Sequence, residues 1–276
     1  VLHQFKCVTF GSQPYVTMTW LIQDVEIIHD VKLVNNSSNQ TTSILSWTPR
    51  KEDNGRVLKC IAENKDLIGS SLSDETELTV YYSPTAFVRL GKPKRAENIQ
   101  AGEDVILECD VTANPTNTSV HWIFNGEKVR SVASSDVKTR DNFIIIRNIT
   151  FNNSGVYSCV AENAVGVGRS DNYNINVKFA PLCLNNSHNT IAAVMKERVK
   201  VTCNVAAEPE NVTFKWAFTN SDEVVDLPDQ YFSSQGRSSV LLFKVRKESD
   251  YGSVLCWAMN GIGTQTEPCV FTIKEI

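Results

Sequence analysis

The chain has 276 residues, of which 42% are hydrophobic, and a formal net charge of −4. This length allows two or three domains, and the hydrophobic content is that of a folded chain rather than a disordered one. A slightly acidic chain without a run of lysines or arginines argues against a nucleic-acid partner. The longest apolar runs, such as residues 143–146, are strand-sized and far short of the roughly 20 residues that span a bilayer.

The first part of the chain is predicted to form short strands. Residues 6–10 and 16–21 alternate in the manner of strands, and the turn residues 11–14 separate them. Residues 35–42 are strongly polar, and we interpret them as a loop at a sheet edge. Glycans on this loop would shield a broad face of the first domain.

Two further features belong to this part. Leu45, Trp47 and Pro49 alternate with polar residues, which indicates that Trp47 faces the core; an exposed, partner-binding tryptophan is the alternative. Gly55 lies five residues before Cys60, one residue further than the corresponding glycine of the next repeat. This spacing predicts a bulge or a shifted turn.

The middle part has the most regular pattern. Strands are predicted at residues 105–111 and 120–124, and the Asn125–Gly126 pair that follows is a strong hairpin signal. Ile144, Ile146 and Ile149 have the spacing of inward-facing residues. Tyr157 lies two residues before Cys159, which is the position of a tyrosine corner in an immunoglobulin-like sandwich.

The last part alternates in the same way. Strands are predicted at residues 199–203 and 212–216. Leu241, Phe243 and Val245 should point to one side, towards the core. Acidic residues such as Asp250 precede the next strand and are expected to stabilise its entry turn.

A cysteine–tryptophan–cysteine pattern repeats along the whole chain. In each repeat the tryptophan follows the first cysteine by 13 residues, and the three sets are Cys7, Trp20 and Cys60, then Cys109, Trp122 and Cys159, then Cys203, Trp216 and Cys256. This is the pattern of an inter-sheet disulfide with a tryptophan packed against it. It predicts an all-β chain of three tandem immunoglobulin-like domains at residues 1–83, 84–180 and 181–276, the second resembling the I-set.

The joins between these domains are short. Residues 81–85 and 178–182 contain aromatic residues and one proline each, and they lack a glycine- or serine-rich run. We therefore expect a semi-rigid rod. Because only six residues precede Cys7, we also expect the first domain to lack its opening strand and the chain to be cut from a longer ectodomain.

Cys183 and Cys269 remain outside the repeat. The first and last strands of such a sandwich can lie side by side, so we pair these two cysteines; intermolecular bridges and metal binding are the alternatives. Eight cysteines without zinc-type C-x-x-C pairs indicate disulfides and an oxidising compartment.

Asn-x-Ser/Thr sequons are frequent. They are candidate glycosylation sites and lie at Asn35, Asn36, Asn39, Asn117, Asn148, Asn152, Asn185 and Asn211. Chance in an asparagine-rich chain is the alternative explanation for their number. Their position in mostly turn-like polar stretches favours a secreted or cell-surface glycoprotein.

No catalytic pattern is present in the sequence. The motifs of serine hydrolases, zinc proteases, phosphate loops and dinucleotide-binding sites are all missing. The four histidines, His3, His29, His121 and His188, are scattered without a second ligand at metal spacing. The sequence therefore predicts a non-enzymatic protein with no cofactor and no metal site.

One family resemblance is specific. The run C-W-A-M-N-G-I-G-T-Q-T-E-P-C-V-F at residues 256–271 resembles the arthropod Sidestep family of multi-immunoglobulin cell-surface receptors. Residues 180–183 and 88–93 also look family-like, and the similarity extends over the whole chain. The resemblance implies an adhesion and axon-guidance receptor recognised by immunoglobulin proteins of the Beaten-path family.

The resemblance also has a positional consequence. Residues 12–14 and 49–55 look like parts of the family's second domain, whereas its partner-binding surface lies on the outermost domain. The partner-binding face would then lie outside this chain, and these domains would act mainly as a spacer or a secondary contact.

These patterns together predict a cell-surface receptor ectodomain that binds another immunoglobulin-superfamily protein and carries N-glycans. It would lie on the extracellular side of a single-pass membrane protein whose anchor is outside the chain. Neither nucleic acid nor a small-molecule substrate is expected as a partner. The alternatives are a secreted immune-type recognition protein and a purely structural spacer.

Overall fold

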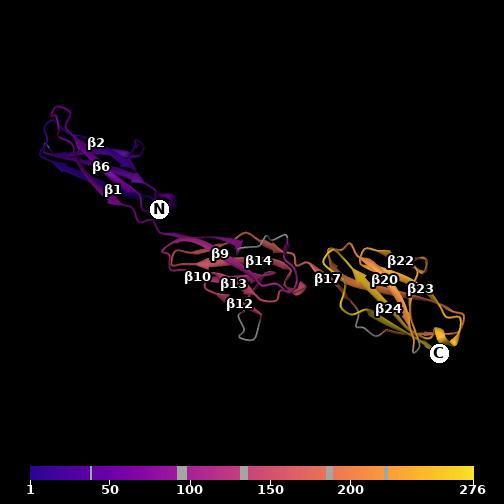
Figure 1. The fold of residues 1–276 in the computed structure, drawn as a ribbon. Coiled ribbons are helices and arrows are strands. Elements are labelled where there is room, and N and C mark those ends of the chain that lie inside the picture. Colours follow the sequence, from indigo (N-terminus) through magenta and orange to yellow (C-terminus); the bar gives the residue numbers. More distant parts are fainter. Residues whose placement is uncertain (38, 92–97, 131–135, 185–188, 221–222) are drawn as a thin grey trace. The chain divides into compact units, whose positions relative to one another are not determined.

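The computed structural model describes residues 1–37, 39–91, 98–130, 136–184, 189–220 and 223–276. For residues 35–37 it describes the backbone only. The described chain is all-β, and its only helical segments are short 3-10 turns. Strands gather in three successive groups along the chain (Figure 1). Each group forms two sheets that enclose a core, so the predicted fold class is confirmed.

Contacts between Cα atoms divide the chain differently from the sheets. They give two compact units, residues 1–86 with 111–120 and 160–169, and residues 87–110 with 121–159 and 170–276. The division falls within the second sandwich.

The first sandwich has a three-stranded sheet in the order β1-β5-β4 and a four-stranded sheet in the order β3-β2-β6-β7. Its elements are β1 (His3–Phe10), β2 (Thr17–Ile22), β3 (Val25–Ile27), β4 (Val31–Ser37), β5 (Gln40–Trp47), η1 (Lys51–Asp53), β6 (Val57–Glu63) and β7 (Leu72–Glu77). Trp20, Leu45 and Leu58 form its buried core, and Trp47 packs against them as predicted.

Two details of this sandwich bear on the predictions. Residues 35–42 are not a loop: β4 and β5 pair there as a hairpin, with Asn35 opposite Thr41. The prediction was wrong because polar residues can continue a strand when the ladder with a neighbouring strand satisfies their backbone groups. Gly55 takes a φ of 78° in a turn with one extra residue before β6, which is the shifted turn that its spacing indicated.

The second sandwich has the sheets β12-β13-β9-β8 and β11-β10-β14-β15, with β16 also paired to β14. Its elements are β8 (Tyr82–Leu90), β9 (Val105–Asn114), β10 (Ser119–Phe124), β11 (Glu127–Lys128), β12 (Val137–Arg140), β13 (Phe143–Ile146), η3 (Phe151–Asn153), β14 (Gly155–Glu162), β15 (Val167–Arg169) and β16 (Tyr173–Ile175). Ile144, Ile146 and Ile149 are fully buried, as their spacing predicts. Asn125 and Gly126 both have positive φ and make the predicted hairpin turn.

The third sandwich has the sheets β17-β19-β23-β22 and β18-β25-β24-β20-β21. Its elements are β17 (Phe179–Cys183), β18 (Asn189–Ala193), β19 (Arg198–Glu208), β20 (Thr213–Thr219), β21 (Val224–Leu227), η4 (Asp229–Tyr231), β22 (Phe232–Gln235), β23 (Ser238–Lys244), η5 (Glu248–Asp250), β24 (Gly252–Met259) and β25 (Cys269–Glu275). Strict alternation explains β19, because every second residue from Val199 to Ala207 is buried while most of the residues between them face solvent.

Candidate recognition surfaces

Each sandwich is crosslinked at its centre by a disulfide beside a buried tryptophan. The pairs Cys7–Cys60, Cys109–Cys159 and Cys203–Cys256 have their Cα atoms 6.5, 6.1 and 6.5 Å apart. Trp20 lies opposite Cys60 in its ladder, and Trp216 lies opposite Cys256. These groups are held within the cores, so they shape the surfaces and do not themselves contact a partner.

The indole nitrogens of the three tryptophans differ in their hydrogen bonding. Trp20 Nε1 donates to Ser43 Oγ at 3.0 Å, and Trp216 Nε1 donates to Ser239 Oγ at 2.9 Å. Trp122 Nε1 is buried and has no acceptor among the described residues. Neither serine was identified from the sequence, although each lies 17 residues before the second cysteine of its repeat.

Tyr157 forms the expected corner. Its hydroxyl donates to the carbonyl oxygen of Asn153 at 2.9 Å, and its ring lies 4.7 Å from that of Phe124 between ring centroids. Burial raises the pKa of Tyr157 well above its ordinary value. The phenol therefore stays protonated at neutral pH and its role is structural.

The fourth disulfide joins Cys183 to Cys269, whose Cα atoms are 5.7 Å apart. Gln265 supports it from a buried position. Its Nε2 donates to Glu267 O at 2.6 Å and lies 3.4 Å from Cys183 Sγ, while its Oε1 accepts from Ala258 N at 2.7 Å. The supporting role of this glutamine was not predicted from the sequence.

An asparagine four residues after the second cysteine recurs in all three sandwiches. In the second, Asn163 Nδ2 donates to Tyr82 O and Pro115 O at 2.9 and 3.2 Å. In the third, Asn260 Nδ2 donates to Phe179 O and Pro209 O at the same two distances. Asn163 and Asn260 thus connect, by hydrogen bonds, the start of the first strand of their sandwich to two of its turns.

Asn64 is the counterpart in the first sandwich and is 3% exposed. Its Nδ2 donates to Ser12 Oγ at 2.9 Å and to Gln13 O at 3.4 Å. The sequence showed the recurring asparagine, but its partners lie in other segments, so the hydrogen bonds could not be inferred from it.

The candidate glycosylation sites comprise asparagines whose side chains the structure describes and asparagines whose side chains lie outside the described part. The described side chains are all exposed and belong to Asn39, Asn117, Asn148, Asn152 and Asn211. Asn185 and the side chains of Asn35 and Asn36 lie outside the described residues. Asn148 has a φ of 46° and its backbone N–H donates to Asp104 Oδ1 at 2.9 Å, so it occupies a tight turn.

Strand β7 at the edge of the first sandwich is unusual in composition. All six of its residues are exposed, and three of them, Asp74, Glu75 and Glu77, are acidic. Within the described part of the chain, one ion pair involves this strand, between Glu75 and Lys59 at 3.7 Å. An acidic edge strand resists pairing with strands of other chains, because like charges repel at close approach.

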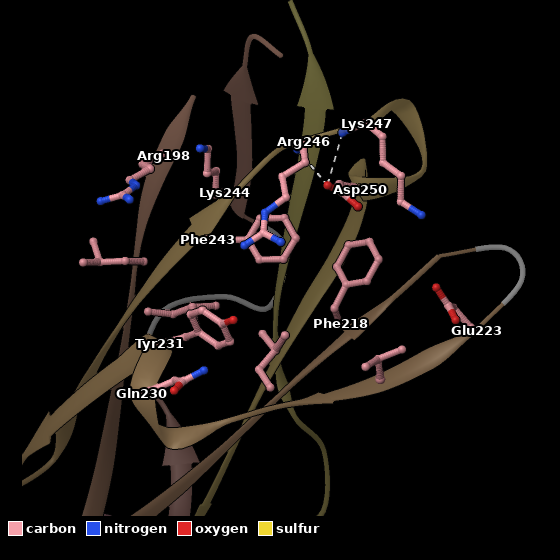
Figure 2. A pocket seen from close by; sticks show the side chains of 14 residues that line it. Arg198, Phe218, Glu223, Gln230, Tyr231, Phe243, Lys244, Arg246, Lys247 and Asp250 are labelled. Atoms are coloured by element: carbon pink, nitrogen blue, oxygen red, sulfur yellow. Dashed lines mark hydrogen bonds between the residues drawn. The ribbon is translucent and has the colours of Figure 1, made fainter. Parts of the chain in front are cut away.

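A recess opens in the third sandwich between its two sheets (Figure 2). It encloses about 620 Å³, and Phe218, Phe243, Leu227 and Leu241 provide apolar lining. Phe218 and Phe243 stack with their centroids 5.2 Å apart. Four exposed cations, Arg198, Lys244, Arg246 and Lys247, also line it, so the recess combines apolar surface with positive charge.

The acidic side chains at this recess are fewer. Asp250 Oδ2 accepts from the backbone N–H groups of Arg246 and Lys247 at 2.7 and 3.3 Å, which is the predicted turn-stabilising role of this acid. Glu223 lies on the same side of the view as Lys247 and away from Arg198 and Lys244 (Figure 2). The recess was not predicted, because its lining residues are spread from position 198 to position 250.

The described residues show no group of three or more histidine, cysteine, aspartate or glutamate side chains able to hold a metal ion. His121 is half-buried on β10. Within the same residues, no helix is long and apolar enough to cross a membrane.

Two domain models match the chain. The immunoglobulin domain model matches residues 90–163, and the CD80-like C2-set immunoglobulin domain model matches residues 2–71. The three sandwiches with their central disulfides agree with both. The chain is therefore a tandem array of immunoglobulin-like sandwiches, of which the first two match these domain models.

Several curated proteins resemble this tandem immunoglobulin chain. Human Kin of IRRE-like protein 1 is 27% identical over 93% of the chain and 31% of its own length. Tyrosine-protein phosphatase Lar of Drosophila melanogaster is 27% identical over 79% of the chain and 10% of its own length. Human Cell adhesion molecule 3 is 27% identical over 58% of the chain and 39% of its own length. The chain therefore spans well under half of these relatives.

Solved structures share its fold. A complex of Dpr2 Ig1-Ig2 with DIP-Theta Ig1-Ig3 contains a chain with a TM-score of 0.52 and 19% identity, covering 100% of this chain and 94% of that one. The ectodomain of mouse nectin-like molecule 4 gives a TM-score of 0.51 and 22% identity, covering 64% of this chain and 59% of its own. At these identities the likeness concerns the fold alone.

Proposed function

We propose that this tandem immunoglobulin chain acts in adhesion-type recognition of another immunoglobulin-superfamily protein. The observation that carries the proposal is the similarity to human Cell adhesion molecule 3 over 58% of the chain, and the match to Kin of IRRE-like protein 1 extends the likeness to 93%. Similarity over most of the chain indicates shared tandem organisation, and not only a common single domain. Function in such folds resides in surfaces, and the proposal assigns no catalytic step.

We place this recognition outside the cell. Four disulfides persist in oxidising compartments, and exposed sequons suit a secreted or cell-surface protein. The finer proposal follows from the Sidestep-like run at residues 256–271: a guidance receptor anchored by a single membrane span outside this chain, with a Beaten-path-type partner. Domains at residues 1–83, 84–180 and 181–276 would then serve as a spacer or secondary contact.

A multivalent binding screen tests the proposal. The glycosylated chain, displayed as an oligomer, is applied to a panel of immunoglobulin-superfamily ectodomains that includes Beaten-path-type proteins. We expect saturable binding to at least one member. The same display of reduced, unfolded chain serves as the control, because it keeps the composition but loses the sandwiches.

The screen also separates direct recognition from the spacer role. Each bait is tested alone and joined to an additional N-terminal immunoglobulin domain of a Sidestep-family receptor. Binding only by the joined bait supports the spacer role. Failure of both baits across the panel would overturn the proposed function.

A further inference from the structure

We propose that the recess of the third sandwich binds an extended acidic segment of a partner protein that carries a bulky apolar side chain. The proposal rests on the protein-recognition function proposed above and specifies the chemistry of the partner. It concerns the recess lined by Arg198, Lys244, Arg246, Phe218 and Phe243 (Figure 2).

The first argument is charge. Arg198 lies directly opposite Lys244 in the ladder between β19 and β23. Like charges directly opposite each other on neighbouring strands destabilise a sheet. No described carboxylate forms an ion pair with Arg198, Lys244, Arg246 or Lys247. An acidic ligand would relieve this repulsion, whereas a basic one would increase it.

The second argument is the apolar lining. Phe218 and Phe243 stack beside the cations, and Val225, which lies opposite Phe218 on β21, is 43% exposed in the same lining. A volume of about 620 Å³ falls within the range of roughly 300–1,000 Å³ that is usual for ligand pockets. A purely ionic ligand such as a sulfated glycan would leave this apolar surface uncovered.

The third argument is an available strand edge. β22 begins at Phe232, which pairs with Leu241, so residues 242–244 of β23 have no strand partner on that side among the described residues. β21 is likewise the last strand of its sheet. An extended peptide can pair with such an edge and insert alternate side chains into an adjoining recess.

Comparison with the second sandwich shows that the fold alone does not impose these features. The corresponding recess there is lined by Phe124, Ile144 and Tyr157 and encloses about 200 Å³. Its charged lining is one lysine and one glutamate, Lys128 and Glu127. The larger volume and the four cations are therefore not general consequences of the fold.

The test measures fluorescence anisotropy of a labelled peptide added to the full chain. The probe is a short extended peptide with a central phenylalanine flanked on both sides by glutamates and aspartates. We expect saturable binding that weakens with added salt. Replacing the acids with lysines should abolish it, and replacing the phenylalanine with glycine should weaken it.

Matched variants locate the binding. The double variant Lys244→Glu/Arg246→Glu should weaken peptide binding at least about tenfold, because two attractions become repulsions. Lys215→Glu/Lys274→Glu makes the same charge change on exposed positions of the same sandwich outside the recess, and should leave binding unchanged. Val225→Asn, at a partly exposed position of the apolar lining opposite Phe218, should reduce the preference for phenylalanine over glycine.

Four outcomes would overturn the inference. The first is no peptide binding, and the second is equal binding by the two double variants. The third is tight binding of a heparin oligosaccharide with none of the peptide, which would assign the recess to sulfated glycans. Self-association of the chain that Lys244→Glu/Arg246→Glu abolishes would also overturn it, because the occupant would then be a second copy of this chain. Since the assay contains no partner protein, its result is independent of the partner screen.

Discussion

Single residues explain why three similar cores are not completed in the same way. Ser43 lies opposite Cys7 and Ser239 lies opposite Cys203, and each accepts a hydrogen bond from its tryptophan. The position 17 residues before Cys159 is Asn142, in the two-residue turn that connects β12 and β13. Its backbone oxygen accepts from Cys109 N at 2.8 Å, but its side chain has no partner among the described residues.

The difference predicts unequal effects of two matched substitutions. Ser239→Ala removes the acceptor of a buried indole N–H and should lower the free energy of unfolding of the third sandwich by about 1–3 kcal/mol. Asn142→Ala removes no such bond and should cost less than about 0.5 kcal/mol. Scanning calorimetry of the full chain measures both, and equal losses would contradict the assigned role of the serine.

The recurring asparagine acts on whole elements. In the second sandwich, Asn163 binds the carbonyl of Tyr82, where β8 begins, while its Oδ1 accepts from Val165 N and Gly166 N. Gly168 on β15 lies so close to Pro84 that a Cβ there would overlap the proline carbonyl. The asparagine and the glycine thus hold the first strand of the sandwich against its last hairpin.

Asn163→Asp should release this end of β8. The carboxylate would face the carbonyl oxygens of Tyr82 and Pro115 without a proton to donate, which should cost about 2 kcal/mol. We expect faster chymotryptic cleavage at Tyr81 and Tyr82, followed by mass spectrometry. Asn174→Asp makes the same change at an exposed position of β16 and should leave the cleavage rate unchanged. Equal rates for the two variants would refute the assignment.

Strand positions were predictable where burial imposes alternation. β19 and β13 were found from their apolar periodicity, since one face of each is packed into a core. β7 was not, because all six of its residues are exposed and no periodicity marks them. The hairpin of β4 and β5 was missed for the related reason that its tip, residues 35–42, is polar.

The candidate recess could not have been predicted from local patterns. It needs β22 to begin only at Phe232, which leaves part of β23 uncovered, and it needs Phe218 to meet Phe243 across the two sheets. Both conditions depend on residues far apart in the sequence. The cysteine spacing, by contrast, is periodic along the chain and predicts three cores without any knowledge of contacts.

At the scale of the whole molecule, the stability of each sandwich depends on its central crosslink. The bridged cysteines are separated by 53, 50 and 53 residues. Closing loops of that length contributes about 4 kcal/mol each in the chain-entropy model, against about 5–15 kcal/mol for a typical domain. Loss of a central bridge would therefore remove a large share of the stability of a sandwich.

This dependence predicts that the compartment of synthesis decides whether the chain folds. Secreted chain should show no reactive thiol after denaturation, and enzymatic removal of N-glycans should lower its mass. Chain made in a reducing cytosol should be unfolded or aggregated by circular dichroism and sedimentation. The variant Cys183→Ala/Cys269→Ala is the control: it keeps all three central bridges, so it should fold when secreted and lose about 3–4 kcal/mol in the third sandwich only. Cytosolic chain with free thiols and the same thermal midpoint as the secreted form would show that the crosslinks are not needed for folding.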